Sequence, residues 1–449
     1  MPTSPYKFNV AADPTRVRWE FTTLATMYVC YAAFMLCRNT VVAASPAMVQ
    51  DPSLGLDIEK FGRLMSWASV GAIVGKLVTG VAADRIGGRR LLLLTLLLTA
   101  ACTAAFGLVS SIFFFGGLNF AGQFFKAGGW PAMAKIIGKW YSSDKHGRVW
   151  SIISTSSRVG TITAGVVLGA LLTWLPWRGV FIVSGVVATA MVFVGYVWLK
   201  DRPEDVGISP LVNEDSPTAK EPHFLDGTTL FQACLVFVLS ARVWLICLGL
   251  AFLTALMDFF NFIPLYLSET VGIAPGQAAM AGSAFPTGMF VALIACGIFY
   301  DRLSRRRLVW AIGGLLCLSC SSVLFLWSLP SLPLSDSLRL PAAMLSIFVF
   351  GFSVSPAYYI PMSVFSIAFG GRHSGFLIAL IDVFGYSGAF VFNFFGGSIV
   401  KNHGWPVFLG LLLTVAVLAV VTVTLFLHLE YISEKKQNAL ENAVANSAG

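Results

Sequence analysis

Long apolar segments, separated by short polar ones, run along almost the whole chain. A helix that spans a lipid bilayer needs about 20 mostly apolar residues, and twelve segments of the sequence meet this need. They are residues 19–45, 61–83, 91–110, 112–137, 148–172 and 178–199, then 242–268, 278–299, 308–328, 340–362, 374–399 and 405–428. This pattern predicts an all-α integral membrane protein with twelve transmembrane helices.

The longest polar segment divides the twelve predicted helices into two sets of six. Residues 201–227 are rich in proline and acidic side chains, which indicates a linker. The apolar stretch 228–240 is too short to cross a bilayer and is typical of a helix lying along the membrane. We predict an N-terminal six-helix bundle (1–200), a cytoplasmic linker (201–240), a C-terminal six-helix bundle (241–433) and a cytoplasmic tail (434–449).

The composition excludes the main classes of soluble protein. Of the 449 residues, 57% are hydrophobic and 12% are charged, whereas a soluble domain carries about 25% charged residues. A cytosolic enzyme, a nucleic-acid-binding protein and a disordered scaffold are therefore excluded. The five histidines are isolated, and we find no metal-ligand spacing, nucleophile–base motif or nucleotide-binding loop. The sequence predicts no metal, no cofactor and no enzymatic activity.

The placement of the cations predicts the orientation of the chain. Of the 30 lysines and arginines, twenty-one lie on the side of the termini and the linker, and five lie in the opposite loops. Cytoplasmic loops carry the excess of Lys and Arg, so we expect both termini in the cytoplasm and a multi-pass protein of the plasma (bacterial inner) membrane. The remaining four cations lie inside predicted helices: Arg38, Lys76, Lys126 and Arg158.

A short motif recurs at the same place in the two halves. The pattern Gly-x-x-x-Asp-Arg, followed by a basic cluster, occupies residues 80–90 after the second helix and 297–307 after the eighth. We expect its acids and arginines to pair across helix ends as a conformational latch, with its first glycine allowing close helix packing. Two parallel six-helix halves with a site between them are typical of transporters. The predicted latch residues are Gly80, Asp84, Arg85, Arg89, Asp301 and Arg302.

These two motifs resemble the signature of the major facilitator superfamily. Within the first 210 or so residues the chain also resembles the organophosphate:phosphate antiporter (glycerol-3-phosphate and sugar-phosphate transporter) family. The segments that carry this resemblance are Tyr31 with Arg38-Asn39, Gly75-Lys76, Gly128-Gly129-Trp130-Pro131, Lys139-Trp140, Ser154-Thr155-Ser156 and Arg202-Pro203-Glu204-Asp205-Val206-Gly207. The resemblance implies secondary transport of an organophosphate in exchange for phosphate. It also implies that Arg38 binds the substrate.

The cations of the first half are candidate ligands for an anion. A charge at the bilayer centre costs ~2.5–3.5 kcal/mol, so it normally faces a cavity or a partner. Arg38 follows Tyr31 by two helical turns, which places both on one face. Its planar guanidinium suits a phosphate or carboxylate, and the alternative is that it snorkels to the outer interface. Lys126 lies on one polar stripe with Asn119 and Gln123, which favours a position in a cavity.

Two of the cations have more than one interpretation. Arg158 either binds the substrate or pairs with Asp258 or Asp382. Lys76 matches a basic residue of the antiporter family, and it contacts substrate, assists the latch or snorkels.

The second half contributes acids in place of cations. Asp258 shares a helix face with Thr254 and Asn261, and Asp382 shares one with Tyr386 and Asn393. The antiporter family has a basic residue near the position of Leu256, and this chain has none in the body of that helix. Asp258 or Asp382 would carry a proton, or would pair with Arg158 or Lys126. The predicted substrate-binding residues are Arg38, Lys126, Arg158, Tyr31, Asn261, Tyr358 and Tyr386.

Three functional hypotheses follow. The leading one is a secondary active transporter of a small organic anion, of organophosphate or carboxylate type, that works by alternating access. The second is a proton-coupled transporter of a zwitterion whose amine meets Asp258 or Asp382, and the third is a non-transporting membrane sensor of the same fold. The expected partners are the lipid bilayer, a small anionic or zwitterionic substrate and a counter-ion, either phosphate or a proton. We expect a monomer.

Overall fold

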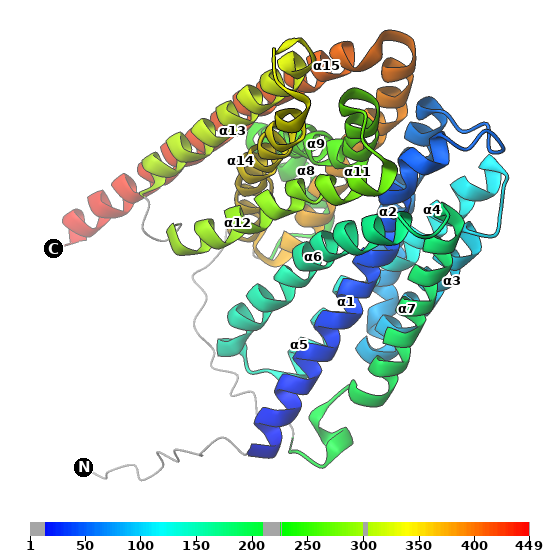
Figure 1. Ribbon diagram of the computed structural model, residues 1–449. Helices are drawn as coiled ribbons and strands as arrows, with labels where there is room; N and C mark the ends of the chain where they lie inside the picture. Colours follow the sequence, from blue (N-terminus) through cyan, green and yellow to red (C-terminus); the bar gives the residue numbers. More distant parts are fainter. Residues whose placement is uncertain (1–13, 210–224, 226, 300–303, 449) are drawn as a thin grey trace.

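The computed structural model describes residues 14–209, 225, 227–299 and 304–448, and the regular elements within them are all helices (Figure 1). The first half contains α1 (Pro14–Val49), α2 (Ile58–Ile86), α3 (Gly88–Phe106), α4 (Ile112–Lys126), α5 (Gly129–Trp140), α6 (Ser143–Leu172) and α7 (Trp177–Trp198). The second half contains α8 (Leu230–Leu239), α9 (Ala241–Asp258), α10 (Ile263–Tyr266), α11 (Pro275–Gly282), α12 (Ala284–Phe299), α13 (Arg305–Ser328), α14 (Asp336–Gly370) and α15 (Ser374–Ala448). Short 3₁₀ or π segments occupy Pro203–Val206 (η1), Phe259–Asn261 (η2), Leu267–Val271 (η3), Leu329–Ser331 (η5) and Gly371–His373 (η6).

Ten of the described helical segments are long and apolar enough to cross a membrane. One of them, 60 residues long, lies within α15 and is interrupted at Gly404 by non-helical backbone (φ 78°, ψ 175°). It therefore makes two passages, because a helix of about 20 residues already spans the bilayer. The helix α4 has only 15 residues but continues into α5 after a short turn. These segments together account for twelve passages. Residues 210–224 and 226 of the predicted linker lie outside the described residues.

Three of the passages are interrupted near their middles, and in each case a proline lies just beyond the break. One of these breaks is at Ser283, between α11 and α12, with Pro286 beyond it. Pro131 follows the turn between α4 and α5, and Pro264 follows the 3₁₀ segment η2 after α9. A proline has no N–H to donate to the carbonyl four residues earlier, and its ring clashes with that carbonyl. The helical ladder is thus broken near Ala127 and Phe260.

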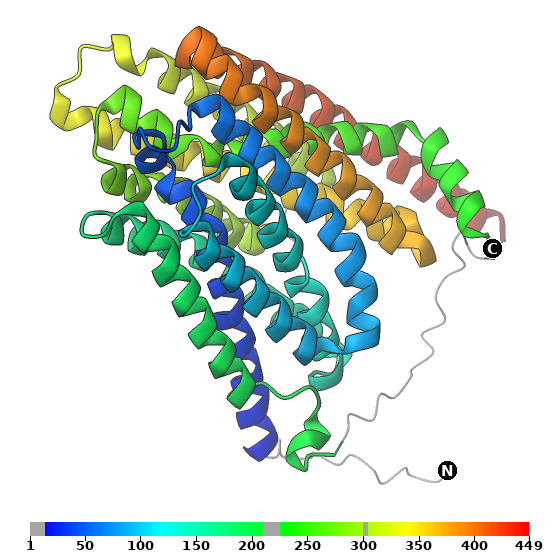
Figure 2. The same cartoon turned by 90° about the vertical axis from the view of Figure 1, so that its right-hand side faces the viewer.

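The two halves contact each other through pairs of helices that pack backbone against backbone. A Cβ atom at Gly62 of α2 would lie 2.4 Å from the carbonyl oxygen of Asn393, and one at Gly397 of α15 would lie 2.3 Å from that of Ile58. Figure 2 shows the first part of α15, in orange, running alongside α2. The helices α6 and α11 meet in the same way at Gly169 and Gly276. Only glycine fits at such crossings, because any side chain would separate the helices.

Polar contacts between the halves cluster at the end of the bundle that lies away from the termini. Lys401 lies 3.0 Å from Asp57 and 2.9 Å from Glu59, and Gln50 donates a hydrogen bond to Ser268 (3.3 Å). At the opposite end, the described ion pairs stay within one half, for example Lys135–Asp84 and Arg242–Glu430. This conformation is therefore closed at the end distant from the termini, which we call the distal end.

Candidate functional site

In two of the interrupted passages, the helix before the break ends on a charged residue, and the two charges are opposite. Lys126 is the last residue of α4, and Asp258 is the last residue of α9. Broken helices of this kind place charged side chains and unpaired backbone groups near the middle of the membrane, where transporters bind substrates and ions. The sequence pattern indicated both charged residues but not the breaks. The signals that mark the breaks are Pro264 and the Gly128-Gly129-Trp130-Pro131 segment.

Arg38 and Lys126 line the same small void within the first half. Its volume is about 20 Å³, and its walls come from α1, α3, α4 and α7. Arg38 is exposed and Lys126 is partly exposed. Gln123 and Asn119 line the void as well, and Asn119 donates a hydrogen bond to the carbonyl oxygen of Leu64 (3.0 Å), which fastens α4 to α2. All three polar residues of the predicted stripe thus lie on the void, and the amide of Asn119 is already engaged.

Asp258 is held by amide side chains of the second half. Asn393 of α15 donates a 2.5 Å hydrogen bond to Oδ2 of Asp258, and Asn261 donates to Oδ1 of Asn393 (3.2 Å). Arg38 and Lys126 lie close enough to act on Asp258 electrostatically. Among the described residues, however, no ion pair within 4.0 Å involves any of these three groups. Two cations of one half therefore face an acid of the other without neutralising it directly.

A second charged pair joins the halves directly. Lys76 Nζ of α2 lies 2.6 Å from Asp382 Oδ2 of α15, and the same ammonium lies 4.7 Å from the centre of the Tyr386 ring. The predicted group Asp382–Tyr386 is thus brought together, and its cation is Lys76. This bridge between the halves was not among the alternatives given for Lys76, which were substrate contact, assistance to the latch and snorkelling.

Arg158 contacts an aromatic ring in place of an acid. Its guanidinium carbon lies 4.2 Å from the centre of the Tyr359 ring, and Nη1 donates to the carbonyl oxygen of Ser154 (2.9 Å). The side chain is buried, with 7% of its surface exposed. A cation over an aromatic face is stabilised by the quadrupole of the ring. The predicted pairing of Arg158 with Asp258 or Asp382 is therefore not found, because the first is held by Asn393 and the second by Lys76.

The predicted tyrosines lie in packed aromatic contacts around these charges. Tyr31 is buried and meets Trp130 edge to face, with ring centres 5.3 Å apart. Tyr358 and Tyr359 contact each other in the same manner at 4.7 Å. The rings form the apolar walls beside the charged groups, which keeps the surroundings of those groups low in dielectric.

The predicted latch residues of the first half make contacts within that half. Asp84 pairs with Lys135 at 2.5 Å, and Arg85 is exposed. A Cβ atom at Gly80 would meet no atom of the structure within 4 Å, so the close packing predicted there is not present in this conformation. Asp301 and Arg302 lie outside the described residues.

Arg89 contributes to a junction at the terminal end of the first half. Its backbone N–H donates to Asp201 Oδ1 (3.0 Å), and Lys139 forms an ion pair with the same carboxylate. Burial raises the pKa of Asp201, but these two hydrogen bonds outweigh it and lower the pKa overall. Trp140 donates to the carbonyl oxygen of Lys200 (3.0 Å). This junction explains the Lys139-Trp140 segment: it ties α5 to the chain that follows α7.

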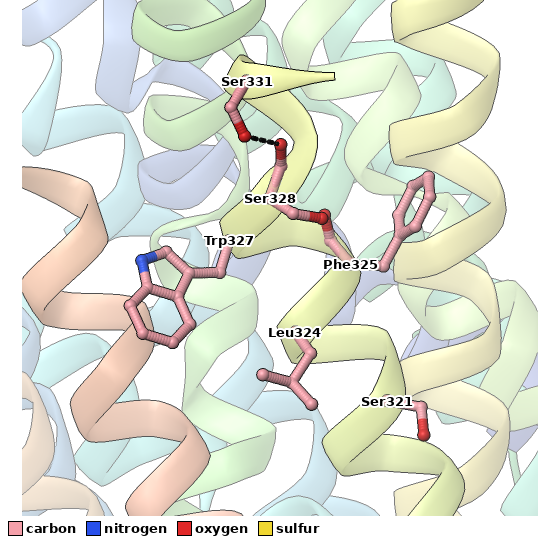
Figure 3. A pocket seen from close by; sticks show the side chains of 6 residues that line it. All are labelled: Ser321, Leu324, Phe325, Trp327, Ser328 and Ser331. Carbon is pink, nitrogen blue, oxygen red and sulfur yellow. Dashed lines mark hydrogen bonds between the residues drawn. The ribbon is translucent and has the colours of Figure 1, made fainter.

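A surface hollow lies elsewhere, on α13. It has a volume of about 710 Å³ and is lined by six residues of α13 and η5, among them Trp327 and Ser331 (Figure 3). All six come from one continuous stretch, and none is charged. A hollow on the surface of one helix is not a site between helices, so we place no ligand there.

Known proteins share the sequence pattern and the fold of this chain. A model of the Major Facilitator Superfamily matches residues 27–270 and again residues 246–448. The chain belongs to this superfamily. The double match agrees with the internal repeat of the sequence. The fold agrees too. This chain superposes, with a TM-score of 0.65 and 17% identity, on the crystal structure of a bacterial homologue of the human lysosomal transporter Spinster in an inward-facing and unoccupied conformation. The match covers 93% of this chain and 96% of that one.

Curated relatives within the superfamily support the more specific resemblance. A probable hexose phosphate transport protein of Chlamydia trachomatis is 25% identical over 93% of this chain and 94% of its own length. The membrane sensor protein UhpC of Salmonella typhimurium is 28% identical over 70% of this chain and 71% of its own. The predicted membership of the superfamily is confirmed, and these relatives support the resemblance to its organophosphate antiporter branch. The roles of individual residues remain predictions.

Proposed function

We propose that this superfamily member is a secondary active transporter of organic phosphates that works by alternating access. The observation that carries the proposal is the placement of Arg38 and Lys126 on one void of the first half beside a broken helix, where neither has an ion-pair partner among the described residues. Two cations that are not paired directly require an anion, and a phosphate accepts hydrogen bonds from both. Relatedness to a hexose phosphate transport protein supports the same chemical class.

We further propose that the termini lie in the cytoplasm, because the cations gather on their side of the predicted helices. The conformation closed at the distal end then opens toward the cytoplasm. To face the other side, the halves would separate Lys401 from Asp57 and Glu59, and would bring together the latch segments 80–90 and 297–307 at the terminal end.

Exchange for inorganic phosphate is the counter-transport that fits this site. Without an anion, closure of the halves around the site would bury Arg38 and Lys126 with their charges uncompensated, which costs free energy. A bound phosphate or organic phosphate compensates those charges in either direction of the cycle. The empty carrier would therefore reorient slowly, and transport would require an anion on each side.

The test is counter-transport in proteoliposomes that contain the purified chain. Vesicles loaded with inorganic phosphate are expected to take up labelled glucose 6-phosphate, and vesicles loaded with chloride are not. The sensor relative defines the competing function. Binding of glucose 6-phosphate without any exchange would contradict the transport function and support a sensor.

The contacts of Lys401 are expected to stabilise the conformation closed at the distal end. Replacing Lys401 with alanine should shift the population toward separation of the distal ends by several-fold at most, since exposed ion pairs are individually weak. Distances between one spin label near the start of α2 and another near the Gly404 kink of α15 measure this shift. Lys60→Ala is the matched control, because the ammonium of Lys60 donates to the carbonyl oxygen of Gly55 in its own loop, and the backbone N–H that it donates to Asp57 is kept in the variant.

The same contact is expected to be insensitive to pH near neutrality. Burial raises the pKa of Asp57, but hydrogen bonds from Lys60 N–H and from Lys401 lower it overall. A carboxylate with a lowered pKa stays charged at every pH above the ordinary aspartate pKa of about 3.9. Its stabilising effect is lost only as the pH falls below that pKa. A marked change in the label distances between about pH 5 and pH 8 would contradict this assignment.

A further inference from the structure

We propose that the preferred substrate carries an ammonium group as well as a phosphate, and that Asp258 binds the ammonium. This inference rests on the proposed function and names the substrate class within it. The phosphate would lie against Arg38 and Lys126 of the first half, and the ammonium against Asp258 of the second.

The structure distinguishes the two acids of the second half. Asp382 has a cation at 2.6 Å, Lys76, and its charge is thereby matched. Asp258 has an amide donor at Oδ2, and among the described residues it has no cation within 4.0 Å. An amide hydrogen bond orients a carboxylate but leaves its charge in place, so Asp258 is the acid that a ligand would neutralise.

The position of Asp258 on its helix adds to the negative potential there. It is the last residue of α9, where the chain passes into the 3₁₀ segment η2. The C-terminus of a helix carries a partial negative charge from its unpaired carbonyls, and cations are stabilised near it. In transporters with broken helices, such C-terminal ends coordinate cations. The carboxylate and the helix end thus favour the same ligand group.

A hydrogen-bond network fixes the position of the Asp258 carboxylate. Asn261 donates to Asn393, which in turn donates to Asp258, so two amides from η2 and α15 hold the carboxylate at the end of α9. Asn261 and Asn393 are 4% and 0% exposed, respectively. A buried network of this kind is rigid, because each amide would lose a hydrogen bond if the carboxylate turned away.

The neighbouring cations determine what else the ligand contains. Arg38 and Lys126 act electrostatically on Asp258 yet lie beyond ion-pair distance. A ligand with phosphate and ammonium groups a few bonds apart would meet both signs of charge. A ligand with a hydroxyl in place of the ammonium would leave the charge of Asp258 unmatched in a desolvated site, and binding sites reject such analogues strongly.

Glucose 6-phosphate and glucosamine 6-phosphate test the inference, since they differ by one substituent. Each is used to inhibit the exchange of labelled inorganic phosphate in proteoliposomes at about pH 7, where the amine is mostly protonated. We expect the wild-type protein to prefer glucosamine 6-phosphate about tenfold, as a charge-assisted hydrogen bond replaces a neutral one. Phosphoethanolamine against glycerol 3-phosphate repeats the comparison with smaller ligands.

Asp258→Asn keeps the shape of the side chain and removes its charge. In this variant we expect the preference to fall below twofold while inhibition by glucose 6-phosphate is retained. Asp336→Asn is the control, because Asp336 is a fully exposed acid that pairs with Arg339 in the first turn of α14. It should keep the wild-type preference.

The outcomes separate this inference from the function on which it rests. If neither sugar phosphate inhibits phosphate exchange, the organic-phosphate function fails, and the inference fails with it. If glucose 6-phosphate inhibits and glucosamine 6-phosphate inhibits no better in either ligand pair, only the inference fails, and the wild-type protein alone decides this. A preference that persists in Asp258→Asn, together with loss of dependence on a proton gradient, would overturn the inference and make Asp258 a proton carrier.

Discussion

Replacing Arg38 with lysine is expected to lower organophosphate exchange roughly 10- to 100-fold, which corresponds to one or two hydrogen bonds to a charged group. The variant keeps the positive charge. It loses the planar fork of N–H donors that matches two oxygens of a phosphate at once. An ammonium is also more strongly hydrated, so it is more costly to desolvate when the site closes.

The measurement is the initial rate of phosphate–glucose 6-phosphate exchange in proteoliposomes, with the amount of inserted protein determined in parallel. Arg16→Lys is the matched control: it makes the same substitution on the same helix, at a residue that contacts Glu20 near the start of α1. We expect its rate to equal that of the wild-type protein. If Arg38→Lys also transports at the wild-type rate, Arg38 does not bind the phosphate through its fork.

The charges of this site were visible in the sequence because so few charges lie within apolar segments. Arg38, Lys126 and Asp258 lie inside predicted helices whose other charges are near the ends, and a charge in that position needs a partner or a cavity. The division of sign between the halves was also visible. No structural information is needed for either point, since both depend only on which residues lie inside the spans.

The partners of the charges could not be predicted in the same way. The sequence suggested Arg158 or Lys126 as the partner of Asp382, whereas its partner is Lys76, and this pair depends on α2 packing directly against α15. Arg158 has a tyrosine ring as its partner, and a sequence offers many aromatic residues but no measure of which one lies opposite. Pairing between distant helices depends on crossing angles and side-chain reach, which hydropathy does not encode.

The broken helices were missed for a different reason. A hydropathy pattern reports how apolar a segment is, and the breaks after Lys126 and Asp258 leave the composition unchanged. The local signals were present as Pro131 and Pro264, but prolines are tolerated inside many transmembrane helices. Their effect depends on whether neighbouring helices accept the freed carbonyl groups, and that is a tertiary property.

Exchanging the charges of Lys76 and Asp382 is expected to restore transport that each single substitution removes. In this conformation the pair joins α2 to α15 across the interface of the two halves. Lys76→Asp places two carboxylates side by side, and Asp382→Lys places two ammonium groups side by side. Each like-charge pair would push the halves apart at the point where α2 and α15 are in contact.

We expect each single charge reversal to reduce exchange at least tenfold. The full cost of breaking a buried pair is not expected, because 38% of the Lys76 side chain and 22% of the Asp382 side chain are exposed, and solvent screens them. The double variant Lys76→Asp with Asp382→Lys recreates an attraction between the same two helices, and it should recover at least a third of the wild-type rate. Lys145→Asp, at an exposed lysine that pairs with Glu20 within the first half, is the single-reversal control and should transport normally.

Recovery in the double variant would separate two roles that single substitutions confuse. If Lys76 serves mainly to hold the halves together, the sign of each partner does not matter as long as the two are opposite, and the double variant transports. If Lys76 instead donates to the phosphate, an aspartate at its position repels the substrate, and no change at residue 382 compensates. A double variant as inactive as Lys76→Asp would therefore remove Lys76 from the interface between the halves and assign it to the anion site beside Arg38 and Lys126.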